Sequence, residues 1–135
     1  MASLILHDVA FSYLNGFAIK QFSLEIEAGE MVAFLGPNGS GKTTLLKLAT
    51  GVLMPNKGEV LLDGRSLIRL SRKEIARKVA MVPQQFHMPF AFRVEEVVML
   101  GRTPFVKIFS AETERDCLMV KHAMELTGIE KFKAR

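Results

Sequence analysis

The segment from Gly36 to Thr43 constrains this chain more than any other. It reads G-P-N-G-S-G-K-T, which matches every fixed position of the phosphate-binding pattern G-x-x-x-x-G-K-[ST]. Glycines let backbone N–H groups turn toward a phosphate, because they carry no Cβ that would block its approach. In this pattern Lys42 reaches the β- and γ-phosphates and the Thr43 hydroxyl binds Mg²⁺. The segment therefore predicts a nucleoside triphosphate site.

The residues on either side of the loop support this prediction. The run 31–35 is apolar throughout and predicts a buried strand, and residues 43–50 have the pattern of a helix that ends at Gly51. A helix that begins at the loop adds free N–H groups and the positive end of its dipole. We assign nucleotide binding to the whole loop and the residue after it: Gly36, Pro37, Asn38, Gly39, Ser40, Gly41, Lys42, Thr43 and Thr44.

Composition sets the class of protein. A chain of 135 residues with 49% hydrophobic and 24% charged residues is long enough for one globular domain. The single cysteine, Cys117, has no partner within the chain, and we expect a buried thiol on a helix. The sequence has no apolar run long enough to span a membrane, and its start lacks the basic region of a signal peptide. These features predict a cytoplasmic protein.

The net charge of +4 is unevenly distributed along the chain. Six basic residues lie between positions 65 and 78, against Glu74 alone. A solvated helix face explains this run, and so does a surface that faces anionic lipid headgroups or a membrane partner. Aromatic residues that could stack on bases do not alternate with these cations, so we expect no nucleic acid partner.

Hydrophobic periodicity and turn residues outline the remaining elements. Four strands are predicted, over residues 4–13, 18–26, 59–62 and 79–82. A tight turn at Asp63 and Gly64 is predicted to follow the third of them. Ser71 and Glu74 have capping-box spacing and predict a helix to about Lys78. Residues 84–93 are expected to form a loop, followed by helices over 94–100 and 112–127, the second opening near Ser110.

Three further segments resemble the nucleotide-binding domain of ATP-binding cassette (ABC) transporters. Phe11-Ser12-Tyr13 resembles the family's adenine-stacking segment, which implies that Tyr13 lies over the base. Residues 58–64 resemble the strand and turn that follow the family's first helix. Val82-Pro83-Gln84 resembles the junction where a glutamine, here Gln84, meets Mg²⁺ and the attacking water.

The resemblance implies an α/β fold with a P-loop NTPase core, an N-terminal antiparallel β subdomain and the start of an α-helical subdomain. The antiparallel part is expected to comprise residues 1–30 and 58–70, and the core residues 31–57 and 71–85. Residues 86–135 are expected to begin the helical subdomain. ATP and Mg²⁺ are the implied cofactors. The preference for ATP over GTP is inferred from Tyr13 and from the resemblance.

The segment 92–104 is similar to the same region of importers for iron-siderophores, haem and cobalamin, and similar segments occur in zinc and manganese importers. The resemblance implies an ATPase that powers import, attached to the inner face of the cell membrane. Its implied partners are transmembrane permease subunits and a second ATP-binding subunit, as a homodimer. In the family, the region that here holds Phe86, Met88, Phe90 and Phe92 receives a helix of the membrane subunit.

The parts that the family uses for hydrolysis do not occur in these residues. The sequence has no Asp-Glu pair, no signature loop and no switch histidine. Asp63 precedes a glycine in a turn, and Glu95 and Glu96 open a helix, so we reject them as the catalytic acid. The chain is expected to be the N-terminal half of a longer protein and to bind ATP without hydrolysing it. The apolar faces of Val32, Phe34, Val79 and Met81 are expected to be partly uncovered.

Two alternatives of other classes remain open. One is a non-hydrolysing nucleotide-binding remnant or regulatory module that is complete at Arg135. The other is a small-molecule kinase, which shares the phosphate loop. The kinase is disfavoured because thirty-five residues with strand pattern precede the loop here.

Overall fold

The computed structural model describes residues 3–14, 16, 18–85, 90–106 and 111–135. The chain divides into two compact units, Met1–Met81 and Val82–Arg135.

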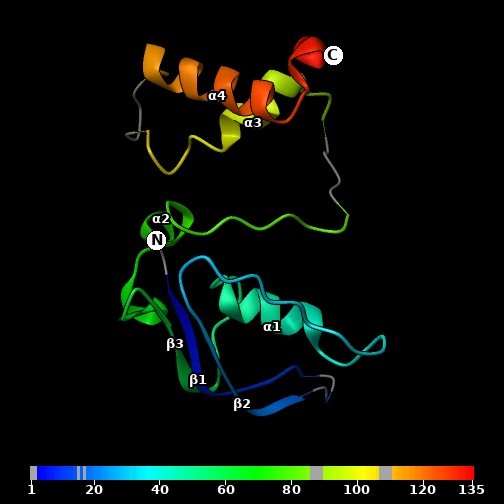
Figure 1. Cartoon of the computed structure of the whole chain (residues 1–135), viewed down its shortest axis with the longest axis vertical. Coiled ribbons are helices and arrows are strands. Elements are labelled where there is room, and N and C mark those ends of the chain that lie inside the picture. The colour runs from blue at the N-terminus through cyan, green and yellow to red at the C-terminus, as the bar shows by residue number, and fades with distance from the viewer. Residues whose placement is uncertain (1–2, 15, 17, 86–89, 107–110) are drawn as a thin grey trace. The chain divides into compact units, whose positions relative to one another are not determined.

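The first unit is built on an antiparallel sheet. Its strands are β1 (Leu4–Ser12), β2 (Ala18–Ile26), β3 (Lys57–Leu62) and β4 (Arg65–Ser66), in the order β2-β1-β3-β4 (Figure 1). The strands predicted over 4–13, 18–26 and 59–62 are confirmed. The predicted turn is also confirmed, since Asp63 and Gly64 connect β3 to β4 with φ values of 51° and 72°.

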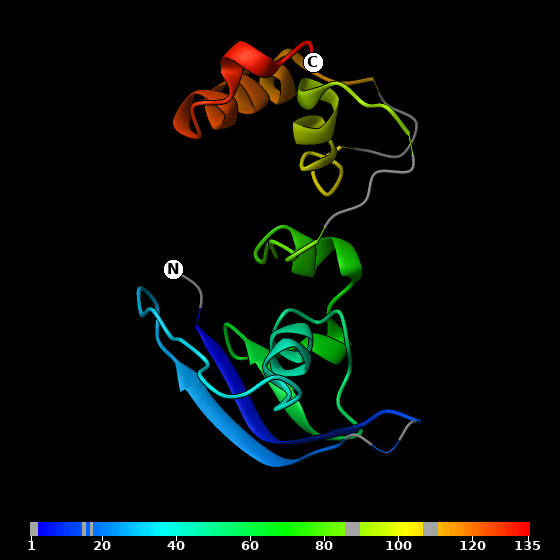
Figure 2. The ribbon, with the colours of Figure 1, turned by 90° about the vertical axis from the view of Figure 1, so that its right-hand side faces the viewer.

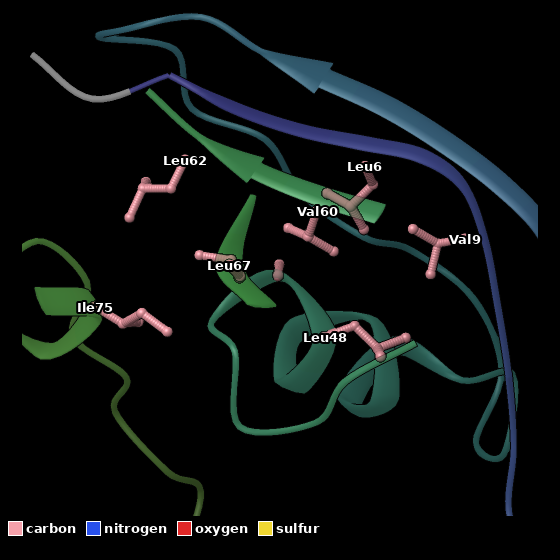
Figure 3. Close-up of a cluster of buried hydrophobic side chains, with 8 residues drawn as sticks. Leu6, Val9, Leu48, Val60, Leu62, Leu67 and Ile75 are labelled. Carbon is pink, nitrogen blue, oxygen red and sulfur yellow. The ribbon is translucent and has the colours of Figure 1, made fainter. Parts of the chain in front are cut away.

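Helix α1 (Lys42–Ala49) packs inside the curve of this sheet (Figure 2). Apolar side chains from the strands, α1, the 3-10 turn η1 (Leu67–Arg69) and helix α2 (Arg72–Ala76) form one core (Figure 3). The members of this core are Leu6, Val9, Leu48, Ala49, Val60, Leu62, Leu67 and Ile75. Each buried leucine or valine contributes about 1.5–3 kcal/mol through the hydrophobic effect.

The start of α2 has the predicted capping box. The Ser71 N–H donates to Glu74 Oε2 at 2.9 Å, and the Glu74 N–H donates to Ser71 Oγ at 3.2 Å. These bonds satisfy N–H groups that have no acceptor inside the helix. The helix ends at Ala76, two residues before the predicted end, and its Ile75 reaches the core.

Two predicted strands are wrong. Residues 31–35 and 79–82 form no strand, and Met31 and Leu35 are 98% and 93% exposed. A strand needs a neighbour that completes its hydrogen-bond ladder, and within the described residues neither run is paired. Of the four residues expected to be partly uncovered, Val32 and Met81 are exposed, whereas Phe34 and Val79 are half-buried.

The second unit contains α3 (Val94–Leu100), α4 (Glu114–Leu126) and the 3-10 turn η2 (Glu130–Phe132). The prediction of α3 is confirmed. The long helix begins after Thr113, which caps it, while Ser110 lies outside the described residues. At the start of α3, the Val94 N–H donates to the Arg135 carbonyl at 2.9 Å.

A buried carboxylate ties the turn after α3 to the start of α4. Asp116 is only 6% exposed. Its carboxylate accepts bonds from Thr113 Oγ1 at 2.6 Å and from Arg102 Nε at 2.9 Å. The hydrogen bond from the Thr113 hydroxyl, followed by the one from Arg102, lowers the pKa of Asp116, so the carboxylate is ionised at neutral pH.

The prediction for Cys117 is wrong, because this thiol is exposed. The buried positions of α4 are Asp116, Val120 and Met124, which follow one another at intervals of four residues. Such spacing places them on one face of the helix, and Cys117 lies next to that face. Among the described residues, no helix has both the length and the apolar character needed to cross a bilayer.

At Gly58 in β3, the backbone of β1 lies so close that a side chain would clash with it. A Cβ at this position would lie 2.3 Å from the carbonyl oxygens of His7 and Asp8, and the φ of Gly58 is +74°. This crossing occurs where the pairing of β1 with β3 changes register, between His7 and Ala10. The two strands can approach at this point only where β3 has no side chain.

We therefore expect Gly58→Ala to destabilise the chain more than Gly64→Ala, its matched control. Gly64 also has a positive φ, but a Cβ there meets nothing within 4 Å. The control should lose about 1–2 kcal/mol from its left-handed backbone, and Gly58→Ala a further ~1–3 kcal/mol from the clash. Urea unfolding followed by circular dichroism measures both, and equal midpoints would contradict the close approach.

Candidate nucleotide-binding site

The assigned loop includes the first turn of α1, and Gly41 is the residue that precedes the helix. Gly41 is the N-cap of α1 with a φ of +96°, a conformation that strains residues with a Cβ. No side chain caps the helix, and the Leu45 N–H donates to the Gly41 carbonyl at 2.9 Å as the first bond of the helix. The N–H groups of residues 42–44 therefore have no acceptor within the helix and are available to an anion.

The side chain of Lys42 folds back over the same loop. Its ammonium group donates to the carbonyl oxygens of Gly36 and Pro37, at 2.8 Å each. The Ser40 N–H closes a turn onto the Pro37 carbonyl at 3.3 Å. The ammonium thus lies against the loop, where phosphate oxygens can replace these carbonyls as acceptors with a stronger, charge-assisted bond.

The charge of this segment suits a phosphate group. Residues 36–44 contain no acidic side chain, and the first turn of α1 contains none either. The positive end of the helix dipole and the Lys42 ammonium therefore face no carboxylate of the loop itself. The residues present fit a polyphosphate.

The two threonines of the first turn have different surroundings. Thr43 is exposed, so its hydroxyl is accessible to a metal ion that accompanies the phosphates. Thr44 is buried, and its backbone N–H is the group that we expect to contact the nucleotide. Both assignments remain predictions.

Tyr13 follows the end of β1 in the first unit. Its ring is half-buried and meets the Phe11 ring edge to face, with ring centres 4.8 Å apart. This contact orients the ring while part of it stays accessible to a base. The role of Tyr13 in stacking on adenine remains a prediction.

Gln84 belongs to the second unit, whereas the loop and Tyr13 belong to the first. Its side chain is exposed, and its role with Mg²⁺ and water remains a prediction. In the region expected to meet a membrane subunit, Phe86 and Met88 lie outside the described residues. Phe90 and Phe92 are exposed and contact each other edge to face, with ring centres 6.4 Å apart.

Sequence reasoning missed the group that holds the other end of α1. The guanidinium of Arg72, at the start of α2, donates to the Gly51 carbonyl just after α1. A cation at this end complements the negative end of the helix dipole. The run of basic residues suggested a solvated face or a membrane surface, and no local signal connects Arg72 to a residue so far along the chain.

Comparison with known proteins agrees with the family resemblance seen in the sequence. A family model described as "ABC transporter" matches residues 19–135. The uncharacterized ABC transporter ATP-binding protein YvrA of Bacillus subtilis (strain 168) is 47% identical over 121 residues, which cover 89% of this chain and 27% of YvrA. The hemin import ATP-binding protein HmuV of Gloeobacter violaceus is 40% identical over 117 residues, which cover 87% of this chain and 42% of HmuV.

A solved structure has the same fold over the whole chain. It is an ABC transporter assigned to the metal-chelate type, in an inward-facing conformation, with a TM-score of 0.76 and 26% identity. The match covers 100% of this chain and 49% of that one. The chain therefore spans between about a quarter and a half of the length of these relatives.

We expect Lys42→Ala to weaken MgATP binding by more than about a hundredfold, because each charge-assisted bond of the ammonium contributes about 1.5–3 kcal/mol. The matched control is Lys47→Ala, which removes the same charge from the last turn of α1. Isothermal titration calorimetry measures both. Binding by Lys42→Ala at the affinity of the unsubstituted chain would show that the site is elsewhere.

Proposed function

The chain belongs to the ABC transporter family, and on that premise we propose that it is the ATP-binding part of an importer ATPase. The observation that carries this proposal is the loop 36–44 at the start of α1. There an uncapped helix end and the Lys42 ammonium lie together without a neighbouring carboxylate of the loop. This combination suits the phosphates of ATP, the ligand that the family binds.

Each assigned residue has a distinct task in this proposal. Lys42 and the N–H groups of the loop bind the phosphates, and the Tyr13 ring stacks on adenine. Thr43 and Gln84 hold Mg²⁺, which neutralises phosphate charge when it is bound. Gln84 in addition positions the water that attacks the terminal phosphate in the complete protein.

The substrate class proposed is a metal chelate such as an iron-siderophore, haem or cobalamin. Its support is the segment 92–104, together with a relative named for hemin import and a structure of the metal-chelate type. We propose permease subunits as partners on the inner face of the membrane, and a second copy of the ATP-binding subunit. The exposed Phe90 and Phe92 are part of the surface that contacts the permease.

These 135 residues are proposed to bind ATP without hydrolysing it. Hydrolysis needs a carboxylate that activates water, and the candidate carboxylates have structural partners. Asp63 accepts a bond from the Ser3 N–H at 3.0 Å and pairs with Lys78. Glu96 accepts a bond from the Arg93 N–H at 2.7 Å, and Glu95 pairs with the Arg93 side chain at 3.2 Å.

Stacking by Tyr13 is tested by comparing ATP with inorganic tripolyphosphate, which has no base. Tyr13→Ala should weaken ATP binding roughly tenfold, since stacking on an aromatic ring contributes about 1–3 kcal/mol, and should leave tripolyphosphate binding unchanged. Tyr13→Phe is the control that keeps the ring. An equal loss for both ligands in Tyr13→Ala would reject the assignment.

The importer proposal and the alternative of a non-hydrolysing regulatory module are separated by one pair of measurements. Phosphate release by the purified 135-residue chain should be indistinguishable from buffer while MgATP binds. Cells that carry Lys42→Ala in the chromosomal gene should lose uptake of radiolabelled metal chelate, and cells with Lys47→Ala should retain it. Uptake that survives Lys42→Ala would favour the regulatory module, and turnover by the chain would refute the absence of hydrolysis.

A further inference from the structure

A group of hydrogen bonds lies at the end of β1, at the residue before Tyr13. The Ser12 N–H donates to Asn56 Oδ1 at 2.8 Å, and the Asn56 N–H donates to the Ala10 carbonyl at 2.8 Å. The Ser12 hydroxyl lies 3.4 Å from the same Oδ1 and donates to it. Asn56 is 44 residues further along the chain and directly precedes β3, so these bonds form only once the first unit has folded.

The side chain of Asn56 takes the place of a strand neighbour. In the ladder between β1 and β3, the last pair before the end of β1 is Ala10 with Lys57, two residues short of Ser12. The amide oxygen of Asn56 accepts the Ser12 N–H beyond that point, while Ala18 of β2 pairs with Ser12. Both neighbouring strands therefore supply contacts to the exposed end of β1.

Tyr13 follows Ser12 directly, so the bond from Asn56 fixes the backbone on its N-terminal side. On its C-terminal side, the Gly16 N–H donates to the Tyr13 carbonyl at 3.1 Å. The Tyr13 ring meets the Phe11 ring, and Phe11 packs against the core of the first unit. Residues two apart lie on one face of an extended chain, so the two rings meet only while the backbone stays extended through Ser12.

The end of an exposed strand opens easily, because few contacts oppose its local unfolding. The residue after Tyr13, Leu14, is itself exposed. Without the amide oxygen of Asn56, water would accept the Ser12 N–H, and one of the contacts that place the Tyr13 ring would be lost. A side chain that becomes ordered only when a ligand binds costs affinity. The contribution of Asn56 is therefore made before any ligand is present.

We propose that Asn56 is a positioning residue for base recognition. Its side chain holds the end of β1, so that the Tyr13 ring is already in place to stack on adenine. This role depends on the proposed function, in which Tyr13 stacks on the base. Asn56 acts through Tyr13 and not through the loop 36–44, so it favours a nucleotide over a polyphosphate that has no base.

The position of the ring is measured directly, because Tyr13 is the only tyrosine and the chain has no tryptophan. The time-resolved anisotropy of tyrosine fluorescence separates local motion of this ring from tumbling of the molecule. Without nucleotide, Asn56→Ala should roughly double the amplitude of the fast local component, the difference between an ordered and a flexible site. Asn56→Asp keeps the acceptor oxygen and should retain the value of the unsubstituted chain.

Ser23→Ala is the matched control, because it removes the same kind of bond from the same strand. Ser23 Oγ accepts the Asp8 N–H of β1 at 2.9 Å, five residues before Tyr13. The control should leave the fast component of Tyr13 unchanged. Both bonds are exposed and contribute modestly to stability, so the variants should fold, and circular dichroism verifies this.

Calorimetry with ATP and with tripolyphosphate then measures the consequence for binding. Asn56→Ala should weaken ATP binding about fivefold, because the ring has to be ordered on binding, and should leave tripolyphosphate binding unchanged. In a chain that already carries Tyr13→Ala, adding Asn56→Ala should cause no further loss of ATP affinity. The two substitutions are then non-additive, as expected for residues that act through one ring.

A looser ring together with a loss specific to ATP in Asn56→Ala, both absent in Asn56→Asp, would support the proposal. An unchanged fast component in Asn56→Ala would overturn it, and so would a looser ring with unchanged ATP affinity. Equal losses for ATP and tripolyphosphate would overturn it as well, because Asn56 would then support the fold and not the ring. If Tyr13→Ala itself keeps its ATP affinity, the stacking assignment fails and this role of Asn56 fails with it, whereas a failure at Asn56 alone leaves that assignment intact.

Discussion

The packing of α1 on the sheet is the interaction on which the rest of the first unit depends. Leu48 is fully buried among side chains of β1 and β3, and Ala49 beside it is also in the core. These contacts determine where the first turn of α1 lies, and with it the N–H groups of residues 42–44. A shift of the helix by a single turn would move that end by 5.4 Å, further than any hydrogen bond can stretch. In the proposed function, phosphate binding therefore depends on the hydrophobic core that positions α1.

Polar contacts hold α1 at both ends. At its start the Lys42 ammonium lies across the loop on the Gly36 and Pro37 carbonyls. At its end the Arg72 guanidinium binds the Gly51 carbonyl. The same short α2 that supplies Arg72 also supplies Ile75 to the core.

Local patterns predicted most of the elements correctly. The antiparallel strands β1 and β2, the Asp63–Gly64 turn, the capping box of α2 and helix α3 all depend on residues within a few positions of one another. The runs 31–35 and 79–82 failed as strands for a different reason. Their apolar composition indicates a need for burial, whereas a strand exists only where a second strand completes its hydrogen bonds. The burial of Cys117 was predicted wrongly because the buried face of a helix depends on what packs against it. In α4 that face consists of Asp116, Val120 and Met124.

The sequence by itself determined the local structure of the loop 36–44 and predicts its phosphate chemistry. A glycine at the helix start, a lysine within reach of the loop carbonyls and a threonine on the first turn act over distances of one helical turn, so their spacing along the chain is enough to specify them. Only the tertiary structure decided which cation lies at the far end of α1 and which carboxylates are already paired. Those partners are up to 21 residues apart in the chain, and side chains so separated meet only after the core has brought their elements together.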